Sequence, residues 1–229
     1  MKNFDSLAAS WWQLNGPSRL LHRMNSTRVM FIQQAIHNRP MHKVLDIGCG
    51  GGIFTETAAR IPGVKHVDGV DVSESVLEVA RAHASIDKAV HSKVSYLKGP
   101  IEDVTSLTKE SYDVVSLFEV LEHVDSPSKL IEEAMTYTKP GGSIVLSTIN
   151  RTVLSYLTTI FMAEKILKLV PDGVHSWSKY INYGEIKEFV DKKPGWNMSL
   201  AKGSMYVPTQ GWILNNCPSE GNYFMALER

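Results

Sequence analysis

The chain has 229 residues, enough for one large domain with a hydrophobic core of its own. Hydrophobic residues make up 43% of it and charged residues 21%, which is typical of globular proteins, and 24 basic residues balance 24 acidic ones, so no overall field favours a nucleic-acid partner. No apolar run reaches the roughly 18 to 20 residues that cross a bilayer. The two cysteines, Cys49 and Cys217, exclude a disulfide framework.

Strand and helix patterns alternate through the first two thirds of the chain. A helical rhythm of apolar residues over 16–38 ends before Pro40. We expect strands at 43–47, 65–70, 93–97, 112–117 and 143–147, and helices at 53–61, 73–85 and 126–138. Such alternation predicts a parallel sheet with helices on both faces.

The last third of the chain has a different pattern. Residues 150–193 are mainly helical in character and are interpreted as an insertion, and strand patterns return at 198–207 and 223–227. We therefore expect an α/β fold: a doubly wound, mostly parallel seven-stranded sheet with an N-terminal helix and a helical insertion. The whole of 1–229 is predicted to be a single domain.

The segment VLDIGCGGGIF, Val44 to Phe54, places Gly48, Gly50 and Gly52 between a strand and a helix. Glycine lets a turn pass close under a ligand, and the helix N-terminus adds its positive end. The dinucleotide pattern would need a glycine where Ile53 stands, and a nucleoside-triphosphate loop would need G-K-[ST]. The pattern that does match, D-x-G-x-G-x-G, resembles the S-adenosylmethionine motif of class I methyltransferases. The alternative is a turn that serves packing alone.

Asp71 ends the second predicted strand, where an acid can accept hydrogen bonds from both ribose hydroxyls of a nucleoside. Its alternative role is to support the start of the next helix, since Ser73 follows.

A second set of candidates lies in FEVLEHV, after the strand at 112–117. In a helix, Glu119, Glu122 and His123 would share one face at the ligand-binding edge of the sheet. Three interpretations stay open: a divalent-cation site, His123 as a general base, or an acidic helix start with a solvated histidine.

The whole chain resembles the ubiquinone-biosynthesis O-methyltransferases, most of all their mitochondrial fungal branch. The segments that carry this resemblance are ASWW (9–12), LHRMNSTR (21–28), VLDIGCGGGI (44–53), EVLEHV (119–124), KPGG (139–142), STINR (147–151), residues 162–171 and 173–181, and GSMYVPTQGW (203–212).

The resemblance implies two methyl transfers from S-adenosylmethionine to polyprenylated catechol-type intermediates. It implies Arg28, Gly48, Asp71 and Phe118 at the cofactor, and Mg²⁺ held by Glu119, Glu122 and His123. It also implies a peripheral position on the matrix side of the mitochondrial inner membrane, with other ubiquinone-synthesis proteins as partners. Without a presequence, a membrane-associated cytoplasmic protein is the alternative.

Residues 152–170 are strongly apolar but interrupted by Glu164, Lys165 and Lys168. This segment is predicted to be a lid that contacts the membrane surface, with an ordinary core helix as its alternative. Two rival functions use the same architecture. One is a nicotinamide-dependent oxidoreductase, which Ile53 disfavours, and the other is a non-catalytic membrane-associated scaffold subunit.

Overall fold

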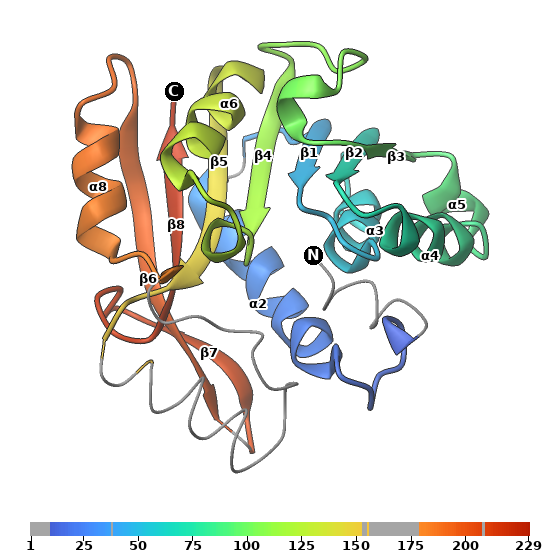
Figure 1. Cartoon of the computed structure of the whole chain (residues 1–229), viewed down its shortest axis with the longest axis horizontal. Helices are drawn as coiled ribbons and strands as arrows, with labels where there is room; N and C mark the ends of the chain where they lie inside the picture. Colours follow the sequence, from blue (N-terminus) through green and yellow to red (C-terminus); the bar gives the residue numbers. More distant parts are fainter. Residues whose placement is uncertain (1–9, 38, 153–154, 156–178, 208) are drawn as a thin grey trace.

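The computed structural model describes residues 10–37, 39–152, 155, 179–207 and 209–229. In this part of the chain the strands form one eight-stranded sheet in the order β3-β2-β1-β4-β5-β8-β6-β7 (Figure 1). The strands are β1 (Lys43–Ile47), β2 (His66–Asp71), β3 (Val94–Lys98), β4 (Tyr112–Phe118), β5 (Thr138–Ile149), β6 (Asn197–Val207), β7 (Gly211–Asn215) and β8 (Asn222–Glu228).

The α-helices lie on both faces of this sheet. They are α2 (Arg19–Ile36), α3 (Ile53–Arg60), α4 (Glu74–Ala84), α5 (Lys88–His91), α6 (Pro127–Tyr137) and α8 (Tyr183–Asp191). Side chains of α6 and α8 pack into one hydrophobic core, whereas those of α2, α3 and α5 pack into another on the opposite face. Two short 3₁₀ helices, η2 (Ile101–Asp103) and η3 (Leu121–His123), follow β3 and β4. The doubly wound α/β architecture is thus confirmed.

The sheet has eight strands, so the predicted number of seven is wrong. The additional strand is β7, which pairs antiparallel with the outer edge of β6. Its sequence, GWILN, is short and half-buried along its whole length, so it lacks the alternation that marks a strand. Strands β1 to β5 are parallel to one another, and β8 runs antiparallel between β5 and β6.

The middle of the sheet is well predicted because its composition is unambiguous. All seven residues of β4 are buried, as a central parallel strand requires. The predicted insertion at 150–193 is described only in part, and there it contains α8. Most of the predicted lid at 152–170 lies outside the described residues. The assignment of 1–229 to a single domain stays a prediction.

Candidate functional site

Three chain segments meet where the parallel strands β1, β2 and β4 end. The arrowheads of these strands point to the same edge of the sheet in Figure 1. The glycine turn follows β1, Asp71 is the last residue of β2, and Phe118 is the last residue of β4. In an open α/β sheet this is the edge at which ligands bind.

The glycines of the turn have backbone conformations that other residues rarely adopt. Gly48, Gly50 and Gly52 have φ angles of 72°, 53° and 84°. A Cβ atom on Gly48 would lie 2.3 Å from Val120 Cγ2, and one on Gly52 would lie 2.4 Å from the Tyr96 hydroxyl. The fold itself therefore requires these glycines, and their presence alone does not identify a ligand.

Asp71 is held in place by the backbone on two sides. Its Oδ2 accepts a hydrogen bond from the Gly50 N–H at 2.9 Å, and its Oδ1 accepts one from the Ser73 N–H at 2.9 Å. The second bond matches the alternative role in supporting the next helix. The first links the acid to the glycine turn, so Asp71 and the turn form one unit. A carboxylate oxygen has lone pairs for more than one donor, so this arrangement is compatible with a ribose hydroxyl as a further partner.

Asp46, the acid of the glycine motif, lies beneath the turn. It is buried, and it accepts hydrogen bonds from the hydroxyls of Thr55 at 2.6 Å and Ser116 at 2.8 Å. Burial raises the pKa of Asp46 to about 6, although both hydroxyl donors oppose the shift. The side chain ties β1 to α3 and β4, which fixes the turn between them.

Arg28 reaches this edge from α2. Its side chain is buried, and its guanidinium carbon lies 5.1 Å from the centre of the Phe118 ring. It forms an ion pair with Glu119 through Nη2, whereas its Nε–H is buried and has no hydrogen-bond partner among the described residues. Because buried donors are normally paired, this N–H points to an acceptor supplied by a ligand. Arg28 and Phe118, which were predicted together at the cofactor, are in contact.

Glu119 is not in a helix, so the predicted shared face of Glu119, Glu122 and His123 is wrong. Its φ is 53°, in the left-handed region, and only Leu121–His123 form a 3₁₀ turn. This backbone directs Glu119 to Arg28 and to the Ser147 hydroxyl, which donates to its Oε1.

Glu122 is buried, and its Oε2 accepts a hydrogen bond from the Thr148 hydroxyl at 2.8 Å. Burial, and after it the neighbouring charge of Glu119, raises the pKa of Glu122 to about 7. His123 is exposed. One carboxylate is therefore committed to Arg28, the other is enclosed, and the imidazole faces solvent.

This arrangement does not fit the predicted Mg²⁺ site. Within the described ranges, no group of three or more His, Cys, Asp or Glu side chains is placed to hold a metal ion. Glu119 is directed to Arg28 and Ser147, whereas Glu122 is directed to Thr148, so the two carboxylates do not face one common point.

Sequence reasoning missed several residues at this edge. Ser147 and Thr148 hold the two glutamates, and Trp11 and Trp12 contact the glycine turn. Both groups belong to segments, STINR and ASWW, that the sequence analysis used only for the resemblance. The two motifs mark these residues as distinctive. A single sequence does not show, however, that their hydroxyl and indole groups contact residues far away in the chain.

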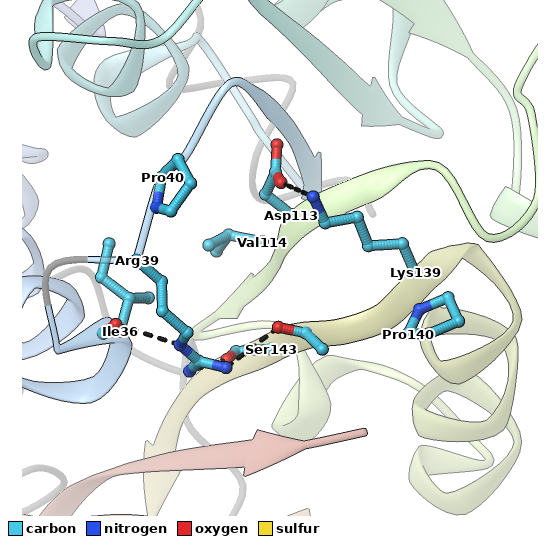
Figure 2. Close-up of a pocket in the computed structure, with 9 residues that line it drawn as sticks. Ile36, Arg39, Pro40, Asp113, Val114, Lys139, Pro140 and Ser143 are labelled. Atoms are coloured by element: carbon cyan, nitrogen blue, oxygen red, sulfur yellow. Dashed lines mark hydrogen bonds and ion pairs between the residues drawn. The ribbon is translucent and has the colours of Figure 1, made fainter.

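A small cavity of about 200 Å³ lies at the opposite edge of the sheet, near the starts of β4 and β5 (Figure 2). The charged groups around it are already paired. Lys139 forms an ion pair with Asp113, and Arg39 pairs with Glu228 and donates to the Ser143 hydroxyl at 2.9 Å. This cavity is therefore assigned to the packing of the strand starts and not to the functional site.

Comparisons with known proteins point to one family. The family model described as "Methyltransferase domain" matches residues 45–146. The ubiquinone biosynthesis O-methyltransferase, mitochondrial, of Candida albicans is 38% identical over all of this chain and 84% of the relative. The protein of the same name from Saccharomyces cerevisiae is 37% identical over all of this chain and 86% of its own length. A bacterial relative from Shewanella, the ubiquinone biosynthesis O-methyltransferase, is 38% identical over 99% of this chain and 93% of its own.

Solved structures agree on the fold. Magnesium protoporphyrin IX methyltransferase from Synechocystis, solved with bound S-adenosylhomocysteine, has a TM-score of 0.63 at 20% identity and covers 90% of this chain and 84% of that one. The methyltransferase domain of a bacterial Hen1 has a TM-score of 0.61 at 19% identity, with 92% and 100% covered. Within the described ranges, every helix is too short or too polar to cross a bilayer.

Proposed function

The chain belongs to the ubiquinone biosynthesis O-methyltransferases, and we propose that its site moves a methyl group from S-adenosylmethionine to a hydroxyl of a polyprenylated catechol-type intermediate. The enzyme is an S-adenosylmethionine-dependent O-methyltransferase of ubiquinone biosynthesis. The family match favours this function over a nicotinamide-dependent oxidoreductase. The observation that carries the assignment to this site is the buried Arg28, whose Nε–H has no acceptor among the described residues.

The residues at this edge fit the two ends of the cofactor. Asp71, oriented by the Gly50 N–H, is placed to accept hydrogen bonds from the ribose hydroxyls. Arg28 is the group for the methionine carboxylate, because a guanidinium matches a carboxylate in shape and charge. The glycine turn lies next to Asp71 and ends at the N-terminus of α3, whose dipole favours the carboxylate. Phe118 supports the guanidinium from beneath.

The bound cofactor would supply an electrophilic methyl group on a sulfonium sulfur. The task of the chain is to hold the acceptor oxygen in line with that methyl group and to exclude water. We assign removal of the hydroxyl proton to His123, which is exposed at this edge, because an imidazole is the side chain that most often acts as a general base. Glu122, with its pKa raised to about 7, is a second group that can hold a proton close by. Binding of Mg²⁺ stays a prediction of the resemblance. Calorimetric titration with S-adenosylhomocysteine, carried out with and without Mg²⁺, tests it.

The surroundings of the reaction are proposed from the sequence and the family. An apolar segment at about 152–170 would let the catechol ring enter while the polyprenyl tail stays in the membrane. The fungal relatives are named as mitochondrial proteins, which supports a mitochondrial location for this enzyme. A peripheral position on the matrix side of the inner membrane is proposed from the resemblance alone. Other ubiquinone-synthesis proteins are the partners expected there. Flotation with vesicles tests the membrane contact, since a variant such as Phe161→Glu should bind less.

Separate calorimetric titrations with S-adenosylhomocysteine and with NADH test the proposed function. The wild type should bind the former and not the latter. We expect Asp71→Ala to weaken binding roughly 10- to 100-fold, since hydrogen bonds to a charged group contribute about 1.5–3 kcal/mol. Asp71→Asn, which keeps one acceptor, should lose less. Asp191→Ala, which removes an exposed acid at the end of α8, is the matched control and should change nothing.

Transfer of a labelled methyl group to a short-chain prenylated catechol then separates an enzyme from a scaffold subunit. Binding of S-adenosylhomocysteine without any transfer would support the scaffold. No binding by the wild type would refute the assignment of this site.

A further inference from the structure

A short segment before α2 crosses the glycine turn. We call Ser10–Gln13 the tryptophan strap. Trp11 is only 6% exposed and shares a small hydrophobic cluster with Ile53 and Val76. A Cβ atom on Gly50 would lie 2.6 Å from the Trp11 indole, and one on Gly51 would lie 2.4 Å from it. The strap therefore packs directly against the main chain of the turn.

Trp12 fixes the position of the strap with a hydrogen bond and a ring contact. Its indole N–H donates to the Gly51 carbonyl oxygen at 2.9 Å. Its ring stacks on His83 of α4, with 3.4 Å between ring centres and 2° between planes. From α2, His22 also approaches the strap, with 2.9 Å between its Nε2 and the Trp11 carbonyl oxygen.

His83 is itself held by a buried acid. Its Nδ1 lies 2.8 Å from Oε1 of Glu56, a residue of α3 whose side chain is 1% exposed. The other oxygen of Glu56 is 3.3 Å from the guanidinium of Arg60. Arg60 also contacts Asp87 at 3.1 Å. Glu56 has two cationic or potentially cationic partners, and His83 is the one that connects it to the strap.

We propose that His83 and Trp12 are positioning residues of the cofactor site, which hold the main chain of the glycine turn in the conformation that orients Asp71. The inference rests on the proposed function. The connection runs through adjacent residues of the turn: the Gly50 N–H donates to Asp71, and the carbonyl oxygen of the following residue, Gly51, accepts from Trp12. If the strap shifts, the Gly51 carbonyl is released, and the N–H that orients the acid loses its support.

This role makes a specific prediction for cofactor affinity. His83→Ala removes the stacking face of Trp12, and we expect the affinity for S-adenosylhomocysteine to fall about tenfold. Trp12→Phe keeps an aromatic face but loses the N–H donor, and we expect a loss of about fivefold, the size of one neutral hydrogen bond. The KM for the methyl acceptor should stay within about twofold in both variants, because neither residue contacts that substrate in the proposed site.

His83→Phe separates positioning from stability. It keeps the flat face against Trp12 but removes the partner of the buried Glu56, so the melting temperature should fall while the affinity stays within about twofold of wild type. His91→Ala, a change of an exposed histidine on α5, is the control and should leave both quantities unchanged. Titrations are run well below the melting temperature of every variant.

The outcomes are distinguishable. If the wild type binds S-adenosylhomocysteine and His83→Ala binds it equally well, the positioning role is refuted and the proposed function stands. If His83→Phe weakens binding as much as His83→Ala, affinity follows stability and His83 is merely structural. If the wild type does not bind at all, the proposed function fails first.

Discussion

Replacing Glu122 by glutamine tests the electrostatics of the site most directly. The carboxyl is buried beside Glu119, its Oε2 accepts from Thr148, and burial followed by the charge of Glu119 raises its pKa from 4.5 to about 7. Glutamine has nearly the same shape and keeps an oxygen for the Thr148 hydroxyl, but it cannot ionise. The substitution therefore removes the buried charge with little change in packing.

The magnitude follows from the size of the shift. The pKa of Glu122 rises from 4.5 to about 7, and since each pKa unit corresponds to 1.36 kcal/mol, the buried charge costs the folded chain about 3 kcal/mol. The native state holds the proton more tightly than the unfolded chain, so the free energy of unfolding of the wild type falls as the pH rises from about 4.5 to about 7. Above pH 7 the cost of the buried charge is constant. We expect Glu122→Gln to be more stable than wild type by up to about 3 kcal/mol at pH 8 and by almost nothing at pH 4.5.

Urea unfolding followed by circular dichroism at pH 5, 6, 7 and 8 measures this difference. Glu78→Gln, which changes an exposed glutamate on α4, is the matched control and should give the same small effect at every pH. A stability difference for Glu122→Gln that does not change between pH 5 and pH 8 would refute the reasoning. It would show that Glu122 titrates in the same way in the folded and the unfolded chain.

Two further predictions concern the roles of single residues. Arg28→Ala should lower the affinity for S-adenosylhomocysteine roughly 10- to 100-fold. Its affinity for 5′-methylthioadenosine, which lacks the amino-acid end, should equal that of the wild type. Equal losses of affinity for both ligands in calorimetry would contradict the contact between Arg28 and the carboxylate. His123→Ala should lower kcat by about 10²- to 10⁴-fold without changing the affinity for S-adenosylhomocysteine. Normal turnover by that variant would remove His123 from the mechanism.

The sequence predicted the centre of this fold better than its edge. Apolar runs such as those of β1 and β4, which are buried along most or all of their length, are typical of central parallel strands. The glycine turn after β1 then predicts that a helix follows, as α3 does. Strand β7 was missed because its stability comes from its neighbour: the Trp212 indole N–H donates to the Leu20 carbonyl of α2, and its own carbonyl accepts from Thr27. The pattern of apolar residues within β7 cannot predict such contacts with a distant helix.

The candidate site shows the same division. Asp71 and the glycines follow from strand ends, and the structure links them by a hydrogen bond. The arrangement of Glu119, Glu122 and His123 was predicted from helical spacing, which fails because Glu119 takes a left-handed conformation to reach Arg28 and Ser147. Both partners are distant in the sequence, Arg28 lying 91 positions before Glu119 and Ser147 lying 28 positions after it, so helical spacing could not reveal them.

Arg28 connects the binding and the electrostatic parts of this site. Its charge lowers the pKa of both Asp46 and Glu122, so it opposes the effect of burial that dominates each of them. It also pairs with Glu119. Removal of the guanidinium would therefore take away a charge that favours the ionised form of each acid. Arg28→Ala is expected to raise the pKa of Glu122 further, so the loss of stability of that variant with rising pH should extend to a higher pH than in the wild type.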